Sequence, residues 1–228
     1  GQRAQLLAKL FDVRALLADD DTGAGGVDRH AAQLGRTLDH DLRDRGLNVL
    51  LVVDSITRFA LAGREVGITA GEPPSARGFP PSVFARLPLL LERLGRVGSG
   101  SITALLTVLV EGDRIEDDPI ADALRGLLDG HILLSRDLAE RGHYPAIDVP
   151  GSISRTMRDV VDDDHLTAAE RVKVLCAALR RAEELREIGA LRAGADPLLD
   201  EAVAKGEALR AFLIQGEAPR PYSETIGA

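Results

Sequence analysis

The stretch LNVLLVVDSITRFA, residues 47–60, decides the fold class of this chain. Its six apolar residues are interrupted only by Asn48, and Asp54, Ser55 and, one helical turn later, Arg58 come directly after them. An apolar run of this kind is typical of a strand that is covered on both faces of a parallel sheet. Because open α/β sheets bind ligands beyond the carboxyl ends of their strands, Asp54 is a candidate binding residue.

Two interpretations of Asp54 remain open on these residues alone. A carboxylate directly after an apolar strand is what a nucleotide hydrolase uses to hold the water shell of Mg²⁺. Alternatively, Asp54 or Ser55 caps the next helix by accepting a hydrogen bond from one of its first N–H groups. Arg58 also has an alternative structural role, in which it pairs with Glu65 or with a loop carboxylate.

Composition limits the classes of protein that need to be considered. The 228 residues are 45% hydrophobic, which is enough to bury a core in one large domain or in one domain with an appendage. The net charge of −8, with no basic cluster, argues against a nucleic-acid binder. The lone Cys176 excludes a disulfide framework, and its place on an apolar helix face favours a core residue over a nucleophile. No apolar run is long enough to span a bilayer, so we expect a soluble, cytosolic protein.

Strand and helix patterns alternate along the first two thirds of the chain. Strands are expected at 13–18, 49–53, 102–110 and 132–134, and helices at 3–11, 28–45, 82–94 and 119–129. This order requires crossover connections, so it predicts an α/β fold with a mostly parallel sheet flanked by helices. From residue 166 the strand patterns stop, and helices at 168–187, 197–205 and 207–215 predict a small α-helical C-terminal domain. We place the two domains at residues 1–163 and 164–228.

Five segments in order resemble the flagellar and type III secretion export ATPases, which are relatives of the catalytic subunits of rotary ATP synthases. The segments are VLLVVDSITRFALAGREVG, GEPPSARGFPPSVFARLPLLLERLG, GSITALLTVLVEGD, DPIADALRGLLDGHILLSRDLAERGHYPAIDVPGSISR and RAEELREIGALRAGADPLLDEAV. The similarity runs nearly without gaps from about residue 13 to residue 222. It implies a partial RecA-like P-loop ATPase core and ATP hydrolysis coupled to protein export.

The resemblance also implies roles for single residues. Asp54 matches the Walker B aspartate, which binds Mg²⁺ through water, and Arg58 matches an arginine near the phosphates and the catalytic carboxylate. Tyr144, in GHYPAID, matches the aromatic residue that lies against the adenine of ATP, although a core role is the alternative. Arg155, in GSISR, matches the arginine finger that reaches the γ-phosphate bound in the neighbouring subunit, and a structural loop residue is its alternative.

Two motifs of the resembling family are absent from the sequence. One is the loop G-x-x-x-x-G-K-[ST], whose amides and lysine cradle the phosphates of ATP, and the other is GER, whose glutamate orients the attacking water. The glycine-rich DTGAGG, residues 21–26, is followed by no Lys-Ser/Thr pair, so we do not interpret it as a phosphate loop. We expect the chain to begin after the phosphate loop, with divergence within the family as the alternative, and to be inactive alone.

The resemblance further implies Mg-ATP bound between the subunits of a homohexamer, in the cytoplasm and peripheral to the inner-membrane secretion apparatus. The implied partners are a central stalk protein, export chaperone–substrate complexes and a peripheral stator protein, and no nucleic acid. A non-catalytic partner or pseudo-ATPase fragment, and a rotary ATP synthase subunit, remain as alternative functions. Residues 110–120, VEGDRIEDDPI, are interpreted as a solvated turn; by resemblance, Asp113 and Glu116 would instead face the central pore of the hexamer.

Overall fold

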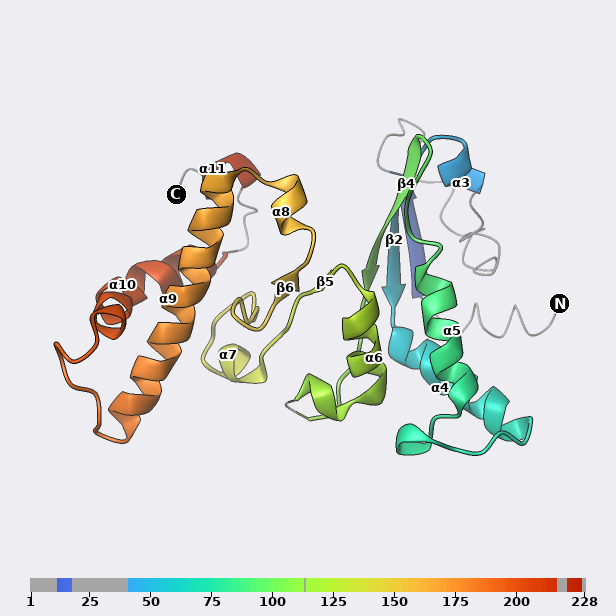
Figure 1. The fold of residues 1–228 in the computed structure, drawn as a ribbon, viewed down its shortest axis with the longest axis horizontal. Coiled ribbons are helices and arrows are strands. Elements are labelled where there is room, and N and C mark those ends of the chain that lie inside the picture. Colours follow the sequence, from blue (N-terminus) through green and yellow to red (C-terminus); the bar gives the residue numbers. More distant parts are fainter. Residues whose placement is uncertain (1–11, 18–40, 113, 217–220, 227–228) are drawn as a thin grey trace. The chain divides into compact units, whose positions relative to one another are not determined.

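The computed structural model describes residues 12–17, 41–112, 114–216 and 221–226 (Figure 1). These residues fall into two compact units, Gly1–Leu128 and Asp129–Ala228. The expected helix at 3–11 and most of the one at 28–45 lie outside the described residues, and the described end of the second is α3 (Asp41–Asp44). No described helix is both long and apolar enough to cross a membrane.

The first unit is built on a four-stranded sheet with the strand order β1-β2-β4-β3. Its strands are β1 (Asp12–Leu17), β2 (Asn48–Asp54), β3 (Gly95–Val97) and β4 (Gly100–Leu106). β2 and β4 run parallel, with Val53 opposite Leu106, whereas β1 and β3 run antiparallel to their neighbours. The α/β class and the strands near 13–18, 49–53 and 102–110 are confirmed, but the last of these ends at Leu106, and parallel pairing is restricted to the two central strands of those described.

Helices cover this sheet through the apolar residues that the sequence pattern marks. They are α4 (Ile56–Thr69), α5 (Pro81–Leu91) and α6 (Pro119–Leu127), with short 3₁₀ turns at Ala76–Gly78 and Ile115–Asp117. Every second residue of β2 is buried, and the residues between them are half-buried. The core combines β2 with all three helices: Val49, Leu51, Val53, Ile56, Val83, Leu87, Ile120 and Leu124. The helix packing therefore fixes both ends of β2.

The expected strand at 132–134 does not join this sheet, so that prediction is wrong. In the second unit, β5 (Gly130–His131) pairs antiparallel with β6 (Ile153–Ser154), and Leu134 forms an isolated bridge with Ile147. A Cβ atom on Gly130 would lie 2.5 Å from the carbonyl oxygen of Ile153, so only glycine permits this close pairing. An apolar run predicts a strand, but it does not specify which strand becomes its partner.

From Asp163 onward the second unit is mainly helical, as predicted, and two further short helices precede that residue. Its helices are α7 (Arg136–Glu140), α8 (Met157–Val160), α9 (Asp163–Glu187), α10 (Pro197–Leu213) and α11 (Tyr222–Ile226). Small and branched residues of α9 and α10 form a separate core of Leu175, Ala178, Ala182, Leu199 and Ala202. The unit begins at Asp129, upstream of the predicted domain boundary at residue 163, and that boundary stays a prediction.

One helix, α10, replaces the two that were expected at 197–205 and 207–215. Gly206, the residue between the two expected helices, lies buried inside α10. A Cβ atom at this position would approach Leu179 Cδ1 of α9 to 3.1 Å. The glycine therefore permits the close packing of two helices, which sequence alone does not distinguish from a helix break.

Candidate functional site

Asp54 is the last residue of β2 and lies at the carboxyl end of the parallel strand pair. Its side chain is exposed, and its Oδ1 atom accepts a hydrogen bond of 2.7 Å from the hydroxyl of Thr107. Thr107 directly follows β4, whose end is level with that of β2. The predicted position of Asp54, at the carboxyl edge of the sheet, is confirmed, and its role stays a prediction.

Ser55, and not Asp54, caps helix α4. The Ser55 hydroxyl accepts a hydrogen bond of 3.4 Å from the Arg58 N–H, and the residue is completely buried, at 0% exposure. The peptide bond between Asp54 and Ser55 is cis. Of the two proposed caps, the structure therefore selects Ser55, which leaves the carboxylate of Asp54 at the exposed edge.

Hydrogen bonds between two segments fix the backbone around Asp54. The N–H of Ile56 donates to the carbonyl of Thr107 at 3.0 Å, and the N–H of Leu109 donates to the hydroxyl of Thr57 at 2.8 Å. The start of α4 is thus joined to the chain that leaves β4. Because both segments follow parallel strands, their polar groups are held at the same edge.

Arg58 lies in the first turn of α4 and has an exposed side chain. The N-terminal end of a helix and a guanidinium group both favour an anionic ligand. The edge that carries Asp54 therefore also offers positive charge, as a phosphate site requires. Glu65, the alternative partner of Arg58, lies seven residues further along α4, and a pair between them stays the alternative interpretation.

Oxygen atoms at this edge are of the kind that Mg²⁺ binds. Mg²⁺ keeps several waters and is usually held by one or two carboxylates together with substrate phosphates. The exposed carboxylate of Asp54 and the adjacent hydroxyl of Thr107 fit this chemistry. Within the described parts of the chain, no group of three or more His, Cys, Asp or Glu side chains is arranged to hold a metal ion.

Tyr144 and Arg155, the other predicted site residues, lie in the second unit. Tyr144 is 57% exposed, which argues against the alternative of a core residue. Arg155 directly follows β6, and its N–H donates a hydrogen bond of 2.7 Å to the carbonyl of Asp129. The structure thus brings Asp54 and Arg58 together in the first unit and places the exposed side chains of Tyr144 and Arg155 in the second.

A buried aspartate organises the turn that precedes Arg155, a feature that the sequence analysis missed. We call residues 148–152, DVPGS, the Asp148 turn. Asp148 is only 9% exposed, and its Oδ1 atom accepts a hydrogen bond of 3.0 Å from the Gly151 N–H. The Ser152 hydroxyl donates to the Asp148 carbonyl at 2.7 Å and accepts from the Leu133 N–H at 3.0 Å. The Pro-Gly-Ser sequence after an aspartate is the one signal of this turn.

The acidic segment at 110–120 forms local contacts. The carboxylate of Glu116 lies 2.6 Å from Arg125 Nη1 and 3.9 Å from Arg114 Nε. A hydrogen bond with its own backbone, and then the one with Arg125, lower the pKa of Glu116. Asp118 caps α6, and Asp113 lies outside the described residues. These contacts are those of a solvated turn, and the pore-facing role stays a prediction.

Cys176 is half-buried beside the α9–α10 core and not within it. Burial raises the pKa of the Cys176 thiol, the negative charge of Asp148 raises it further, and only Arg180 opposes the shift. A thiol with a raised pKa stays protonated at neutral pH and is a poor nucleophile. The structure therefore gives no support to a catalytic role for Cys176.

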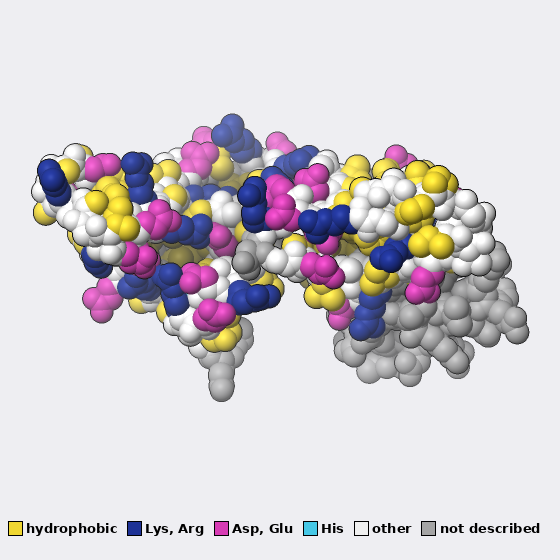
Figure 2. Space-filling view, turned by 90° about the horizontal axis from the view of Figure 1, so that it is seen from below, with side chains coloured by type: hydrophobic (Ala, Val, Ile, Leu, Met, Phe, Trp, Pro, Cys, Tyr) yellow, Lys and Arg dark blue, Asp and Glu magenta, His cyan; other side chains and the backbone are white. Residues whose placement is uncertain are grey.

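Basic and acidic side chains are interspersed over the described surface. On the face in Figure 2, Lys and Arg side chains lie next to Asp and Glu side chains over both units. Ion pairs of this kind connect Arg171 with Glu201 and Arg158 with Glu170. Such a surface lacks the broad positive field that attracts nucleic acid, on the face that the figure shows.

Two protein-family models together match almost the whole chain. Residues 15–154 match the nucleotide-binding domain of the ATP synthase alpha/beta family, and residues 161–228 match the C-terminal domain of the type III secretion ATPase EscN. The type 3 secretion system ATPase of Xanthomonas euvesicatoria is 54% identical over 185 residues, which are 81% of this chain and 42% of that protein. The flagellum-specific ATP synthase of Pseudomonas aeruginosa is 53% identical over 188 residues, 82% of this chain and 42% of that protein.

Solved structures agree with these matches. The assembled ATPase EscN from the type III secretion system of enteropathogenic E. coli superposes with a TM-score of 0.78 at 47% identity, over 84% of this chain and 46% of EscN. EscN in complex with its central stalk EscO gives a TM-score of 0.75 at 45% identity, over 87% of this chain and 48% of EscN. The chain thus spans about half the length of the relatives it matches. It belongs to the ATP synthase alpha/beta family, in the branch of the type III secretion and flagellar export ATPases.

Proposed function

We propose that this chain supplies the Walker B and arginine-finger half of an ATPase that couples ATP hydrolysis to protein export. The observation that carries the proposal is the placement of Asp54. Its carboxylate stands exposed at the carboxyl edge of the parallel pair, held by Thr107, while Ser55 takes over the capping of α4. The helix cap, which was the structural alternative for Asp54, is therefore provided by another residue.

Each residue has a defined part in this proposal. Asp54 would hold Mg²⁺ through its water shell, and the ion would supply charge neutralisation at the phosphates of ATP. Arg58 adds positive charge at the same edge, and Tyr144 lies against the adenine. Arg155 belongs to the site of the neighbouring subunit, where its guanidinium stabilises the charge that spreads over the transferring phosphoryl group. Hydrolysis then requires assembly, because each site takes Asp54 from one subunit and Arg155 from the next.

The proposed assembly is a homohexamer in the cytoplasm, peripheral to the inner membrane at the secretion apparatus. The assembled state of EscN and its complex with the central stalk EscO support an oligomer and a stalk partner for this chain. Export chaperone–substrate complexes and a stator protein are further proposed partners. The match of residues 161–228 to the EscN C-terminal domain favours the export branch over a rotary ATP synthase subunit. Residues 1–163 and 164–228 are the proposed ATPase and helical domains.

The test uses a chimaeric ATPase, in which the part of the Xanthomonas relative that precedes the matched region is joined to this chain. In the chimaeric ATPase, Arg155→Ala should leave ATP binding nearly unchanged and lower turnover by about three powers of ten or more. Asp54→Ala should be inactive as well. Mixing the two variants under conditions of subunit exchange should restore part of the activity, because some interfaces then pair an intact Asp54 with an intact Arg155.

The matched control is Arg158→Ala, since Arg158 is an exposed arginine three residues further along the chain that pairs with Glu170. This variant should keep the turnover of the unchanged chimaeric ATPase. If mixing the Asp54 and Arg155 variants restores nothing although subunits exchange, Arg155 does not act across the interface. If Arg155→Ala turns over like Arg158→Ala, Arg155 is a structural loop residue and the proposed division of the site is wrong.

A further inference from the structure

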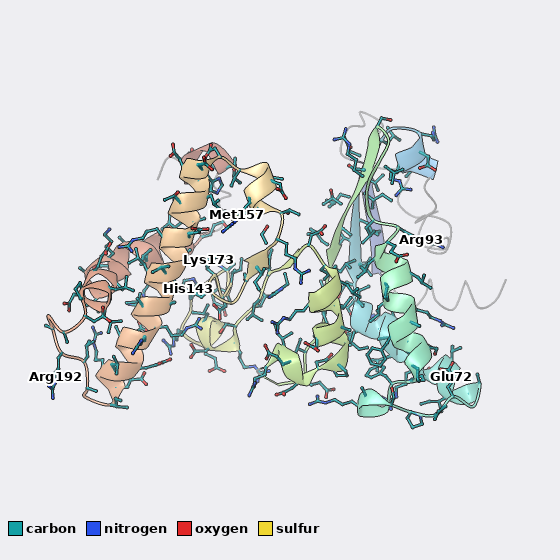
Figure 3. The ribbon with its side chains drawn as sticks, viewed as in Figure 1. Glu72, Arg93, His143, Met157, Lys173 and Arg192 are labelled. Atoms are coloured by element: carbon teal, nitrogen blue, oxygen red, sulfur yellow. The ribbon has the colours of Figure 1, made fainter. Side chains whose placement is uncertain are left out.

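Two basic residues of α9 hold the Asp148 turn. The ammonium group of Lys173 donates a hydrogen bond of 2.9 Å to the carbonyl of Ser152. Arg180 Nη2 lies 3.0 Å from Asp148 Oδ2. Figure 3 shows Lys173 on the side of α9 that faces the segment around β6. The helix therefore contacts the turn at its first and its last residue.

The spacing of the two residues on α9 suits this arrangement. Lys173 and Arg180 are seven residues apart, which is about two helical turns, so both side chains lie on one face of the helix about 10 Å apart. Arg181, the next residue, is exposed on a different face. The side chain of Asp148 is only 12% exposed, so the acid of its ion pair with Arg180 is largely shielded from water. Shielded pairs contribute more than fully exposed ones.

The Asp148 turn leads directly to Arg155. Ser152 is followed by the two residues of β6, which pair with β5, and then by Arg155, whose N–H is fixed on the Asp129 carbonyl at 2.7 Å. Because only two residues separate the turn from Arg155, we expect a displacement of the turn to reach the backbone of Arg155. Arg155 thus lies directly after the short strand β6, whose two residues pair with β5.

We propose that Lys173 and Arg180 are positioning residues for Arg155: by clamping both ends of the Asp148 turn to α9, they set where the guanidinium of Arg155 stands. This inference rests on the proposed function of Arg155 for its effect on catalysis, but its structural part does not. Both residues belong to α9 and would act on the site in the neighbouring subunit only through the Asp148 turn.

The structural part is tested by hydrogen exchange in the 228-residue chain. In the double variant Lys173→Met, Arg180→Gln, the amides of Ser152 and Arg155 should exchange about tenfold faster, because two charge-assisted contacts are lost. The amides of α9 and α10 serve as an internal reference and should be unchanged. Arg181→Gln is the matched control and should alter neither set. If the Ser152 and Arg155 amides exchange at the rate of the control, or if the α9 amides exchange faster to the same extent, Lys173 and Arg180 do not hold the Asp148 turn.

The catalytic part is tested in the chimaeric ATPase. Arg180→Gln should lower kcat about tenfold with little change in the KM for ATP, whereas Arg181→Gln should lower neither. Lys173→Arg should retain activity that Lys173→Met loses. In an Arg155→Lys background, Arg180→Gln should have little further effect, since residues that act through one group are not additive. Additive losses, or a change in KM alone, would overturn the positioning role. Normal turnover of Arg155→Ala would instead show that the proposed function has failed. The hydrogen-exchange experiment would still show whether Lys173 and Arg180 hold the Asp148 turn.

Discussion

The assignment of the α4 cap to Ser55 gives a quantitative prediction that separates a structural from a functional role for Asp54. Ser55→Ala removes the side-chain acceptor of the Arg58 N–H, a bond of 3.4 Å at a completely buried residue. Loss of such a cap costs about 1 kcal/mol, which corresponds to about fivefold faster exchange of the amides in the first turn of α4. Asp54→Asn keeps an oxygen for the Thr107 hydroxyl, so it should cost less than about 0.5 kcal/mol, or about twofold in exchange.

The assay is hydrogen exchange followed by mass spectrometry of peptides that cover α4. A global unfolding curve is less suitable, because the chain forms two compact units and need not unfold in one step. Salt of about 0.5 M screens the interaction between the charge of Asp54 and the helix dipole, so that the cap alone is compared. Ser135→Ala, which removes the cap of α7, is the control and should leave the α4 amides unchanged. If Asp54→Asn loosens α4 as much as Ser55→Ala does, Asp54 has a structural role and the argument from the cap fails.

Three further predictions concern activity, packing and thiol chemistry. The 228-residue chain alone should show no magnesium-dependent ATP turnover in a phosphate-release assay, because G-x-x-x-x-G-K-[ST] is absent; turnover above background would contradict this. Leu87 of α5 is 0% exposed, so Leu87→Ala should lower the stability of the first unit by about 2–5 kcal/mol. The loss should be seen as faster hydrogen exchange of the β2 amides, and unchanged exchange would refute the packing of α5 on β2. Because burial raises the pKa of Cys176, its thiol should react with iodoacetamide more slowly in the native chain than in the urea-unfolded chain near pH 8. The difference between the two rates should narrow at higher pH. Equal rates near pH 8 would contradict this prediction.

The strand that ends at Asp54 could be predicted from local sequence. The apolar run before Asp54 predicted the strand and its carboxyl end, and both were found, because a strand covered by helices must be apolar at nearly every position. The helix at 168–187 was predicted by its apolar spacing and lies within α9. A strand or helix pattern of this kind is a property of consecutive residues, so sequence alone is sufficient for it.

Partner choice was decided only by tertiary structure. The sequence left the cap of α4 to Asp54 or Ser55, and the structure selects Ser55, whose hydroxyl is buried beneath the helix start. It predicted a strand near residue 132, but β5 pairs with β6 because Gly130 permits close approach. Gly206 likewise had two local meanings, a break or a close contact, until Leu179 of α9 was placed against it.

The contacts of α9 with the Asp148 turn show the same division most clearly. Lys173 and Arg180 are ordinary charged residues of a helix, and nothing in their spacing indicates that they reach a turn more than 20 residues away in the chain. Local sequence determines which residues form a strand, a helix or a turn, since those preferences depend on neighbouring residues. Which side chains then meet depends on how the elements pack, and that is a property of the folded chain as a whole.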